Sequence, residues 1–296
     1  MSSGSDLLQR NAMTVDVEDY FHVHAFSDVV APADWDNYPS RVETNTFRIL
    51  DMLARYGVTA TFFVLGWVAK KFPKLACEIY SAGHRVGCHS FAHRVIYAGS
   101  SDDFRRDLKF AKAALEDAIG VPVRSYRAPS YSITSATVWA LEILAEEGFL
   151  YDSSIFPVIH DNYGIPRAPR FPYLHSLRGG QCLREFPPST VRLIGVNFPV
   201  AGGGYLRLVP YSLTAWAVHH INQAEGQPAM VYVHPWEFDP EQPRIPAAWR
   251  SRFRHYQNLE STQEKYRRLL EDFSWGPMEQ VFPEQATSDV QVAAVP

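Results

Sequence analysis

The feature that most constrains this chain is a regular alternation of strand and helix patterns that begins near its start. Residues 11–17 (NAMTVDV) alternate and carry β-branched side chains, which predicts a strand. Residues 41–56 have apolar positions at helical spacing before Gly57, and residues 59–66 (TATFFVLG) form a continuous apolar run, typical of a buried parallel strand. The alternation predicts further helices at 67–82, 102–119 (capped by Ser101), 135–147 (capped by Thr134), 213–223 (capped by Ser212) and 262–273, and further strands at 84–90, 123–127, 149–154 and 229–234.

Repeated strand–helix units without a large interruption indicate an α/β fold with a parallel sheet. The strands are numerous and evenly spaced, so we expect a barrel, and a single domain over residues 11–275 suits the length of 296 residues. Residues 155–210 are rich in proline, glycine and aromatic side chains, and we expect an ordered insertion with strands near 183–186 and 191–197. The last residues, 276–296, are small and polar, as in a flexible tail.

The composition matters mainly for the chemistry that it excludes. The chain has 28 basic and 32 acidic residues, a net charge of −4, so it lacks the basic excess of a nucleic-acid-binding protein. It has 11 histidines and 3 cysteines, which favours imidazole and carboxylate over thiolate in any metal site. Its first residues lack the apolar core of a secretory signal, and no stretch is apolar for long enough to span a membrane. We therefore expect a cytoplasmic protein without a membrane span.

Three acidic residues stand where the first predicted strand ends, and reactive side chains in parallel α/β folds collect at such ends. They are Asp16, Glu18 and Asp19. Strand alternation places Asp16 and Glu18 on the same face. Carboxylates that are packed together repel each other unless they share a proton or a cation. The cluster therefore indicates either a binding site or a solvated acidic loop.

Two histidines mark a second strand end. His89 ends the strand predicted at 84–90, and His93 comes four residues later. If a helix begins there, the two imidazoles share one face, as metal ligands at this spacing do. Together with a carboxylate from the acidic cluster, they predict a two-histidine, one-carboxylate metal site with positions left open for water and substrate.

Two more strand ends carry candidate catalytic residues. Arg127 begins the segment Arg-Ala-Pro-Ser-Tyr, and its guanidinium can pair with Asp16 and keep that carboxylate ionised. His234 closes the strand MVYVH, where a histidine that titrates near neutral pH suits a general acid.

The order and spacing of these segments point to a known family. A T-x-D motif ending at Asp16, the ATFFVLG strand, H-S-x-x-H from His89, R-x-P from Arg127 and a late strand ending in His234 follow one another within residues 13–235. This run resembles the polysaccharide deacetylase family, which is carbohydrate esterase family four. The segments VDVEDYF, YDSSIFP and WEFDP resemble the branch associated with bacterial exopolysaccharide gene clusters.

The resemblance implies a distorted (β/α)7 barrel that hydrolyses the N-acetyl groups of amino sugars in a polysaccharide, such as an exopolysaccharide or a peptidoglycan-like polymer. It also implies a divalent metal, most often zinc. The matching positions are Asp16 as catalytic base, His89 and His93 as metal ligands, Arg127 as the residue that steadies the base, Ser130 through its backbone N–H as oxyanion donor, and His234 as catalytic acid. Tyr131 and Trp236, which lie beside these motifs, are candidates for stacking against the sugar.

Two positions depart from the family pattern. The first motif usually has two adjacent aspartates, but here the second is Val17, so the metal carboxylate falls to Glu18 or Asp19. Strand alternation favours Glu18, and a tighter loop would favour Asp19. The family's fourth motif normally supplies an aspartate that orients the catalytic histidine, and that motif is absent. Asp152 and Glu185 are the candidates for this role.

Two other functions stay open for such a barrel. Altered acidic motifs also occur in amide hydrolases of small or cyclic substrates, such as allantoinases, and activity on a cyclic ureide but not on sugars would favour that class. A non-catalytic polysaccharide-binding barrel is the third possibility. The presence of the base, both histidines and the acid in one sequence argues against it.

Overall fold

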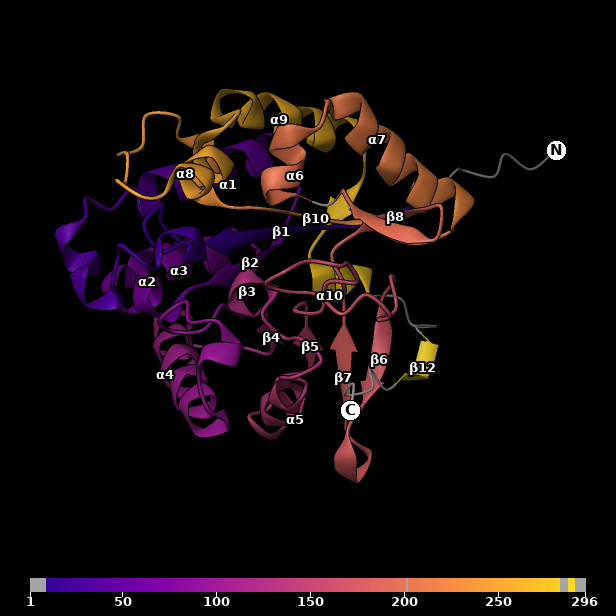
Figure 1. Ribbon diagram of the computed structural model, residues 1–296, viewed down its shortest axis with the longest axis horizontal. Coiled ribbons are helices and arrows are strands. Elements are labelled where there is room, and N and C mark those ends of the chain that lie inside the picture. Colours follow the sequence, from indigo (N-terminus) through magenta and orange to yellow (C-terminus); the bar gives the residue numbers. More distant parts are fainter. Residues whose placement is uncertain (1–8, 201, 283–286, 291–296) are drawn as a thin grey trace.

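The computed structural model, drawn in Figure 1, describes residues 9–200, 202–282 and 287–290. Its strands are β1 (Asn11–Val17), β2 (Thr61–Val64), β3 (Arg85–Cys88), β4 (Ser125–Tyr126), β5 (Tyr151–Asp152), β6 (Tyr173–Ser176), β7 (Cys182–Glu185), β8 (Thr190–Leu193), β9 (Val196–Pro199), β10 (Met230–Val233), β11 (Trp275–Gly276) and β12 (Thr287–Val290). Its α-helices are α1 (Val42–Arg55), α2 (Gly66–Lys71), α3 (Pro73–Ser81), α4 (Ser101–Ile119), α5 (Trp139–Glu146), α6 (Gly203–Leu208), α7 (Tyr211–His219), α8 (Trp249–Tyr256), α9 (Thr262–Asp272) and α10 (Met278–Val281).

The sheet curls into an incomplete barrel with helices around its outside (Figure 1). Its strand order is β10-β1-β2-β3-β4-β5-β7-β6-β12, and β11 also pairs with β1. The strands from β10 to β5 run parallel, whereas β6 and β7 are antiparallel to each other. The expected α/β architecture, a distorted (β/α)7-type barrel, is confirmed. Among the residues that the structure describes, no helix is both long and apolar enough to cross a membrane.

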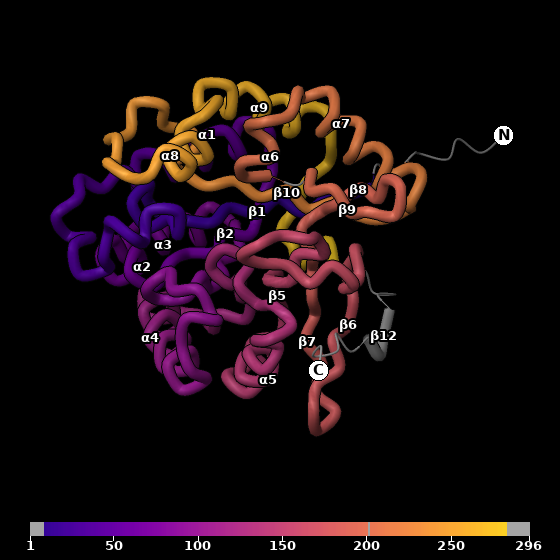
Figure 2. Tube along the Cα trace, viewed as in Figure 1, coloured from indigo at the N-terminus to yellow at the C-terminus, as the bar shows by residue number. Residues whose placement is uncertain are grey.

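Strand β1 lies at the centre of this arrangement. It is buried along its whole length, and it pairs in parallel with β10 on one side and with β2 on the other. Figure 2 shows that the chain also returns to this strand near its end, where β11 pairs with Asn11 and Ala12. The carboxyl ends of β1, β2, β3 and β10 therefore meet at one edge, because neighbouring parallel strands end on the same side.

The helices follow the predicted periodicity, with local differences at their ends. Helix α4 is capped by Ser100 rather than by the predicted Ser101. The Ser100 hydroxyl accepts a hydrogen bond from the Asp103 backbone N–H at 3.2 Å, and the Asp103 carboxylate accepts one from the Ser100 N–H. This capping box satisfies two backbone donors that the first helical turn would otherwise leave unpaired. Gly120, with φ of +72°, ends the helix as predicted.

The helix predicted over 67–82 is two helices, α2 and α3. Helix α2 ends at Lys71, and α3 begins at Pro73. Pro73 lacks the N–H that a continuous helix requires, and its ring disfavours helical geometry at Phe72. The prediction of one helix followed the spacing of the apolar residues and did not account for Pro73, which causes the break.

Two other predicted helix caps are wrong. The Thr134 backbone N–H donates to the Thr137 hydroxyl at 2.8 Å in a turn, and α5 begins only at Trp139. Helix α7 begins at Tyr211, and Ser212 makes no side-chain cap. At Thr134 the hydroxyl of Thr137 closes a turn before the helix, which short-range sequence patterns do not distinguish from a cap, whereas Ser212 already lies inside α7.

The segment expected as an ordered insertion contains two antiparallel pairs. The strand predicted near 183–186 is β7, which pairs with β6. The strand predicted near 191–197 is instead the hairpin of β8 and β9, which turns at Ile194 and Gly195 with φ of +50° and +78°. Two consecutive positive φ values are typical of the tight turns that join antiparallel strands.

The first part of the expected tail packs on the sheet. Met278 of α10 is fully buried and packs in one apolar cluster with Ala12 of β1 and Phe63 of β2. Residues 283–286 and 291–296 of that tail lie outside the described residues.

Candidate active site

Asp16 lies near the carboxyl end of β1 and is fixed by a buried arginine. Its Oδ1 accepts a hydrogen bond from Nη1 of Arg127 at 2.6 Å, and both side chains are buried. Arg127 follows β4, and its guanidinium also donates to the Thr14 hydroxyl at 2.9 Å and to the Ser153 backbone carbonyl at 3.2 Å. A buried ion pair needs such additional hydrogen bonds to offset the loss of hydration. The predicted pairing of Arg127 with Asp16 is confirmed.

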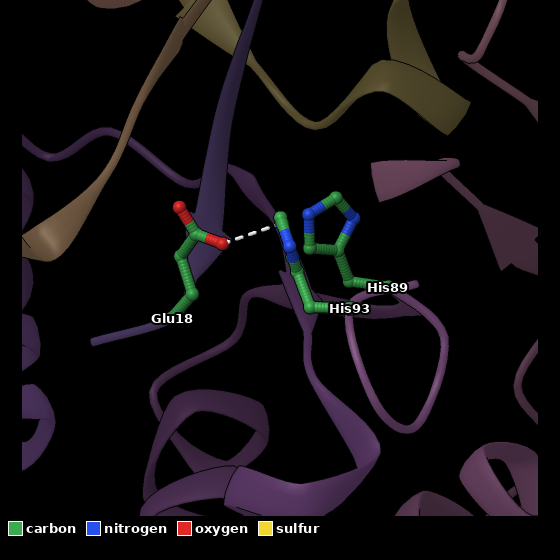
Figure 3. A group of neighbouring side chains, drawn as sticks. All are labelled: Glu18, His89 and His93. Atoms are coloured by element: carbon green, nitrogen blue, oxygen red, sulfur yellow. Dashed lines mark ion pairs between the residues drawn. The ribbon is translucent and has the colours of Figure 1, made fainter. Parts of the chain in front are cut away.

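Glu18, His89 and His93 form a buried cluster at the same edge of the sheet (Figure 3). One ligand atom from each residue lies within 4.8 Å of the other two. Nδ1 of His89 donates to the Arg127 backbone carbonyl at 2.9 Å, which directs its Nε2 lone pair towards the cluster. Nε2 of His93 lies 2.7 Å from Oε2 of Glu18.

The chemistry of this cluster fits a divalent metal. Oε2 of Glu18 is buried, and among the described residues its polar neighbour is the His93 ring alone. Burial lowers the pKa of His89 to about 4, so that imidazole is neutral, as a metal ligand must be. Burial alone would raise the pKa of Glu18, but His93 and His234 hold it below its usual value. Two imidazoles and a carboxylate are the donor set of a zinc site that keeps positions open.

The two histidines converge by a different route from the one that the spacing predicted. No helix joins them. The chain turns, with φ of +62° at Ser90 and +49° at His93. The turn is held by Asp107 of α4, whose carboxylate accepts hydrogen bonds from the backbone N–H groups of Phe91 at 2.7 Å and Ala92 at 3.1 Å. Asp107 carried no sequence signal beyond its place in a helix, because the residues that it holds lie in another element.

Asp19 does not face the cluster. Its Oδ2 accepts hydrogen bonds from the Ser40 hydroxyl at 2.7 Å and from the backbone N–H groups of Arg41 and Val42 at 2.8 and 3.1 Å. Its Oδ1 accepts from its neighbour Tyr20. Asp19 therefore stabilises the start of α1, where negative charge is favourable, and of the two candidate carboxylates only Glu18 reaches the histidines.

His234 follows β10 and lies opposite the two carboxylates of β1. Its Nε2 is 3.8 Å from Oδ2 of Asp16 and 3.8 Å from Oε1 of Glu18. Its Nδ1 donates to Oε2 of Glu237 at 3.1 Å, and Oε1 of Glu237 accepts from Nε of Arg207 at 2.8 Å. Burial alone would lower the pKa of His234, but Glu237, Glu18 and Asp16 raise it to about 9. The imidazole is therefore a proton donor at neutral pH.

Glu237, not Asp152 or Glu185, orients His234. Asp152 accepts a hydrogen bond from the Ser154 hydroxyl at 2.5 Å, and Oε1 of Glu185 accepts from a backbone N–H at 3.0 Å. The two carboxyl groups face each other across β5 and β7, where their residues are directly paired. The signal for Glu237 was its spacing, since a carboxylate three residues after His234 reaches back to it in a tight turn.

The two aromatic candidates are not open stacking surfaces. Trp236 is 5% exposed, and its ring stacks on His234 and on His255 at centroid distances of 5.1 and 4.1 Å. Its Nε1 donates to Oε1 of Glu18 at 3.0 Å, so it positions that carboxylate. Tyr131 is 6% exposed and packs edge-on against Phe156. Their burial contradicts the prediction that they stack against a sugar.

Ser130 lies in the loop that follows Arg127, close in sequence to the buried pair. It is partly exposed and has a φ of +52°, a conformation that non-glycine residues adopt only when the surrounding structure holds them. The role of its backbone N–H as an oxyanion donor stays a prediction.

Comparison with known proteins agrees with this geometry. Residues 31–148 match the family model described as polysaccharide deacetylase, and residues 153–283 match a domain of unknown function, DUF3473. The fold is shared with a crystal structure from Mycobacterium smegmatis assigned to the polysaccharide deacetylases. That structure has a TM-score of 0.61 at 20% sequence identity, over 95% of this chain and 91% of the other.

Two curated relatives match the first half of the chain. A peptidoglycan-N-acetylglucosamine deacetylase of Bacillus cereus is 33% identical over 98 residues, which are 33% of this chain and 36% of that protein. A chitooligosaccharide deacetylase of Sinorhizobium fredii is 36% identical over 124 residues, which are 40% of this chain and 56% of that protein. The matched segment thus spans about a third of the first relative and little more than half of the second. The family model and these relatives thus relate the first half of the chain to the polysaccharide deacetylases, and the Mycobacterium smegmatis structure shares its fold.

Proposed function

We propose that this protein is a metal-dependent hydrolase that removes N-acetyl groups from amino sugars of a polysaccharide, such as an exopolysaccharide or a peptidoglycan-like polymer. One observation carries the proposal. A carboxylate, Asp16, and an imidazole, His234, lie beside the buried cluster of Glu18, His89 and His93. A metal-ligand set with a base and an acid beside it is the arrangement that amide hydrolysis requires.

Glu18, His89 and His93 would hold the metal, and zinc suits this donor set best. When bound, the ion supplies Lewis-acid polarisation of the acetamide carbonyl and lowers the pKa of water in the site. The remaining steps belong to the protein. Asp16, which Arg127 holds by a buried ion pair, accepts the proton of the attacking water.

The other side of the site serves the leaving group. His234 donates its proton to the amine nitrogen as the C–N bond breaks, and the products are acetate and a free amino sugar. Glu237 keeps the Nδ1 proton in place, so that Nε2 faces the reacting atoms. The backbone N–H of Ser130 is the proposed donor to the oxyanion that forms during attack.

The test is acetate release from N-acetylated chitooligosaccharides, measured before and after treatment with a chelator and again after zinc is returned. Chelation should abolish the activity and zinc should restore it. Asp16→Asn should lower kcat by about 10²–10⁴, and His93→Ala should remove both activity and stoichiometric zinc. His84→Asn, a substitution of a buried histidine directly before the amino end of β3, is the matched control and should retain activity. Acetate release that persists without metal, or in Asp16→Asn, would overturn the proposal. Activity on a cyclic ureide alone would replace it with a different amidase.

A further inference from the structure

The segment around α8 forms a strongly basic and aromatic surface. No acidic residue occurs between residues 242 and 259, although the whole chain has a net charge of −4. The exposed arginines of this surface are Arg244, Arg250, Arg252 and Arg254. Among the described residues, none of these four forms an ion pair with a carboxylate. Arg250 and Arg254 are one helical turn apart, so their like charges destabilise α8, and a bound anion would offset that repulsion.

Two large aromatic side chains lie on the same helix. Trp249 is 71% exposed and Phe253 is 59% exposed, and four residues separate them, so they share one face. The guanidinium of Arg250 lies over the Trp249 ring, 5.5 Å from its centre. Neighbouring exposed apolar side chains that form one patch mark interaction surfaces, and these two rings are such neighbours. Flat apolar rings beside guanidinium groups suit a polymer that has both C–H faces and negative charges, which is the chemistry of an acidic glycan.

The inner side of α8 is part of the wall of the candidate active site. His255, which is 3% exposed, stacks on Trp236, and Trp236 donates a hydrogen bond to Glu18. The backbone carbonyl of His255 also accepts a hydrogen bond from Arg207 at 2.7 Å, and Arg207 pairs with Glu237. The basic surface is therefore fixed one layer of side chains away from the proposed metal ligands. In Figure 1, α8 lies at the upper left of the molecule.

We infer that this surface binds the substrate polymer itself and that the substrate is an anionic polysaccharide, with carboxylate groups near the N-acetylated sugar. This inference rests on the proposed function and names its substrate class. Guanidinium groups bind carboxylates with two parallel hydrogen bonds, and Arg250 and Arg254, which share one face of α8, present two such donors about 6 Å apart along the helix. The packing of α8 on the wall of the candidate site favours a glycan over a nucleic acid or a lipid surface, because the proposed substrate of that site is a glycan.

The test compares two soluble chitin derivatives that share a backbone, neutral glycol chitin and anionic carboxymethyl chitin, with the full chain as the enzyme. The wild type should have a KM for carboxymethyl chitin about tenfold lower than for glycol chitin, and the difference should shrink at high salt. The triple variant Arg250→Gln, Arg252→Gln, Arg254→Gln should lose that preference and keep its activity on glycol chitin. The matched control, with the same loss of charge elsewhere, is Arg55→Gln, Lys74→Gln, Arg124→Gln, which should keep the preference.

Binding measured by calorimetry separates this inference from the proposed function. Arginine-dependent binding of carboxymethyl chitin without acetate release from any glycan would overturn the proposed function and leave the surface in place. Acetate release with equal KM values for the two polymers, or a triple variant that weakens both equally, would overturn the inference. So would arginine-dependent binding of single-stranded DNA or of phosphatidylglycerol vesicles without binding of carboxymethyl chitin.

Discussion

Replacing Glu237 with glutamine should separate the stability of the site from its chemistry. Glu237 is fully buried, and its two oxygens serve two partners. Oε2 accepts hydrogen bonds from the backbone N–H of His234 at 2.9 Å and from its Nδ1 at 3.1 Å, whereas Oε1 accepts from Nε of Arg207 at 2.8 Å. Glutamine has nearly the same shape but no charge, so the variant removes the charge with little change in packing.

The structure sets the size of both effects. Arg207 is 2% exposed, and Glu237 is its ion-pair partner, so Glu237→Gln leaves a buried cation without an anion. Such a loss costs about 3–5 kcal/mol of unfolding free energy. The amide can also donate to Nδ1 of His234, which would favour the wrong tautomer of the catalytic imidazole. We therefore expect kcat to fall by about 10²–10⁴ with little change in KM.

Arg207→Gln is the matched control. It removes the other half of the ion pair but leaves the carboxylate of Glu237 beside His234. It should lose a similar amount of stability, measured by urea unfolding, and less than about tenfold in kcat, measured by acetate release well below the melting temperature. If both variants lose activity in proportion to stability, then Glu237 contributes only to folding, and its role in orienting the acid is refuted.

Three further predictions concern the metal and two buried titrating groups. Chelation should lower the unfolding free energy of the wild type by about 2.7 kcal/mol when the free ion had been present at about 100 times its Kd. Differential scanning fluorimetry should show a lower melting temperature after chelation in the wild type and no change in His93→Ala. A wild-type melting temperature that chelation does not change would contradict the metal site. Burial and the charge of Asp152 raise the pKa of Glu185 well above its usual value of 4.5, so its contribution to stability is present below pH 4.5 and lost as the pH rises. Glu185→Gln should therefore gain stability relative to the wild type between pH 4.5 and 8 in urea unfolding, and a difference independent of pH would refute the assignment. Burial lowers the pKa of His84 from 6.5 to about 4, so its contribution is present above pH 6.5 and lost as the pH falls. In His84→Asn the side-chain oxygen can replace Nδ1 as acceptor for the backbone N–H of Ala60, and asparagine does not titrate. The difference in unfolding free energy between the wild type and this variant should therefore become smaller as the pH falls from 6.5 to 4.

The fold was predictable because the barrel strands are buried on both faces. The run that contains β2 has no charged residue, and such runs are read directly from the sequence. Helix α8 was missed for the opposite reason. Its exposed side chains are arginines and large aromatics, so the segment has no apolar stripe at helical spacing, although His255 anchors it.

The candidate site was predictable to the extent that it depends on strand ends. Asp16, Glu18 and His234 lie where the ends of β1 and β10 place them. The convergence of His89 and His93 depends on a turn with positive φ values, which a helical spacing rule represents wrongly. Interactions across the site, such as Trp236 with Glu18, join residues far apart in the chain, and a single sequence contains no signal for such pairs.

The residues of the candidate site come from both segments of the chain, including residues 153–283, which match a domain of unknown function. Residues 31–148, which match the deacetylase model, contain both metal-type histidines, but Asp16 and Glu18 precede them and His234 lies within residues 153–283. The later segment supplies β10, which pairs with β1 along four residues and covers one side of it. Without that segment the central strand would lose a neighbour, and the proposed acid, its orienting carboxylate and the basic surface on α8 would all be missing. We therefore expect the segment of unknown function to be part of the catalytic barrel, and not a separate module attached to it.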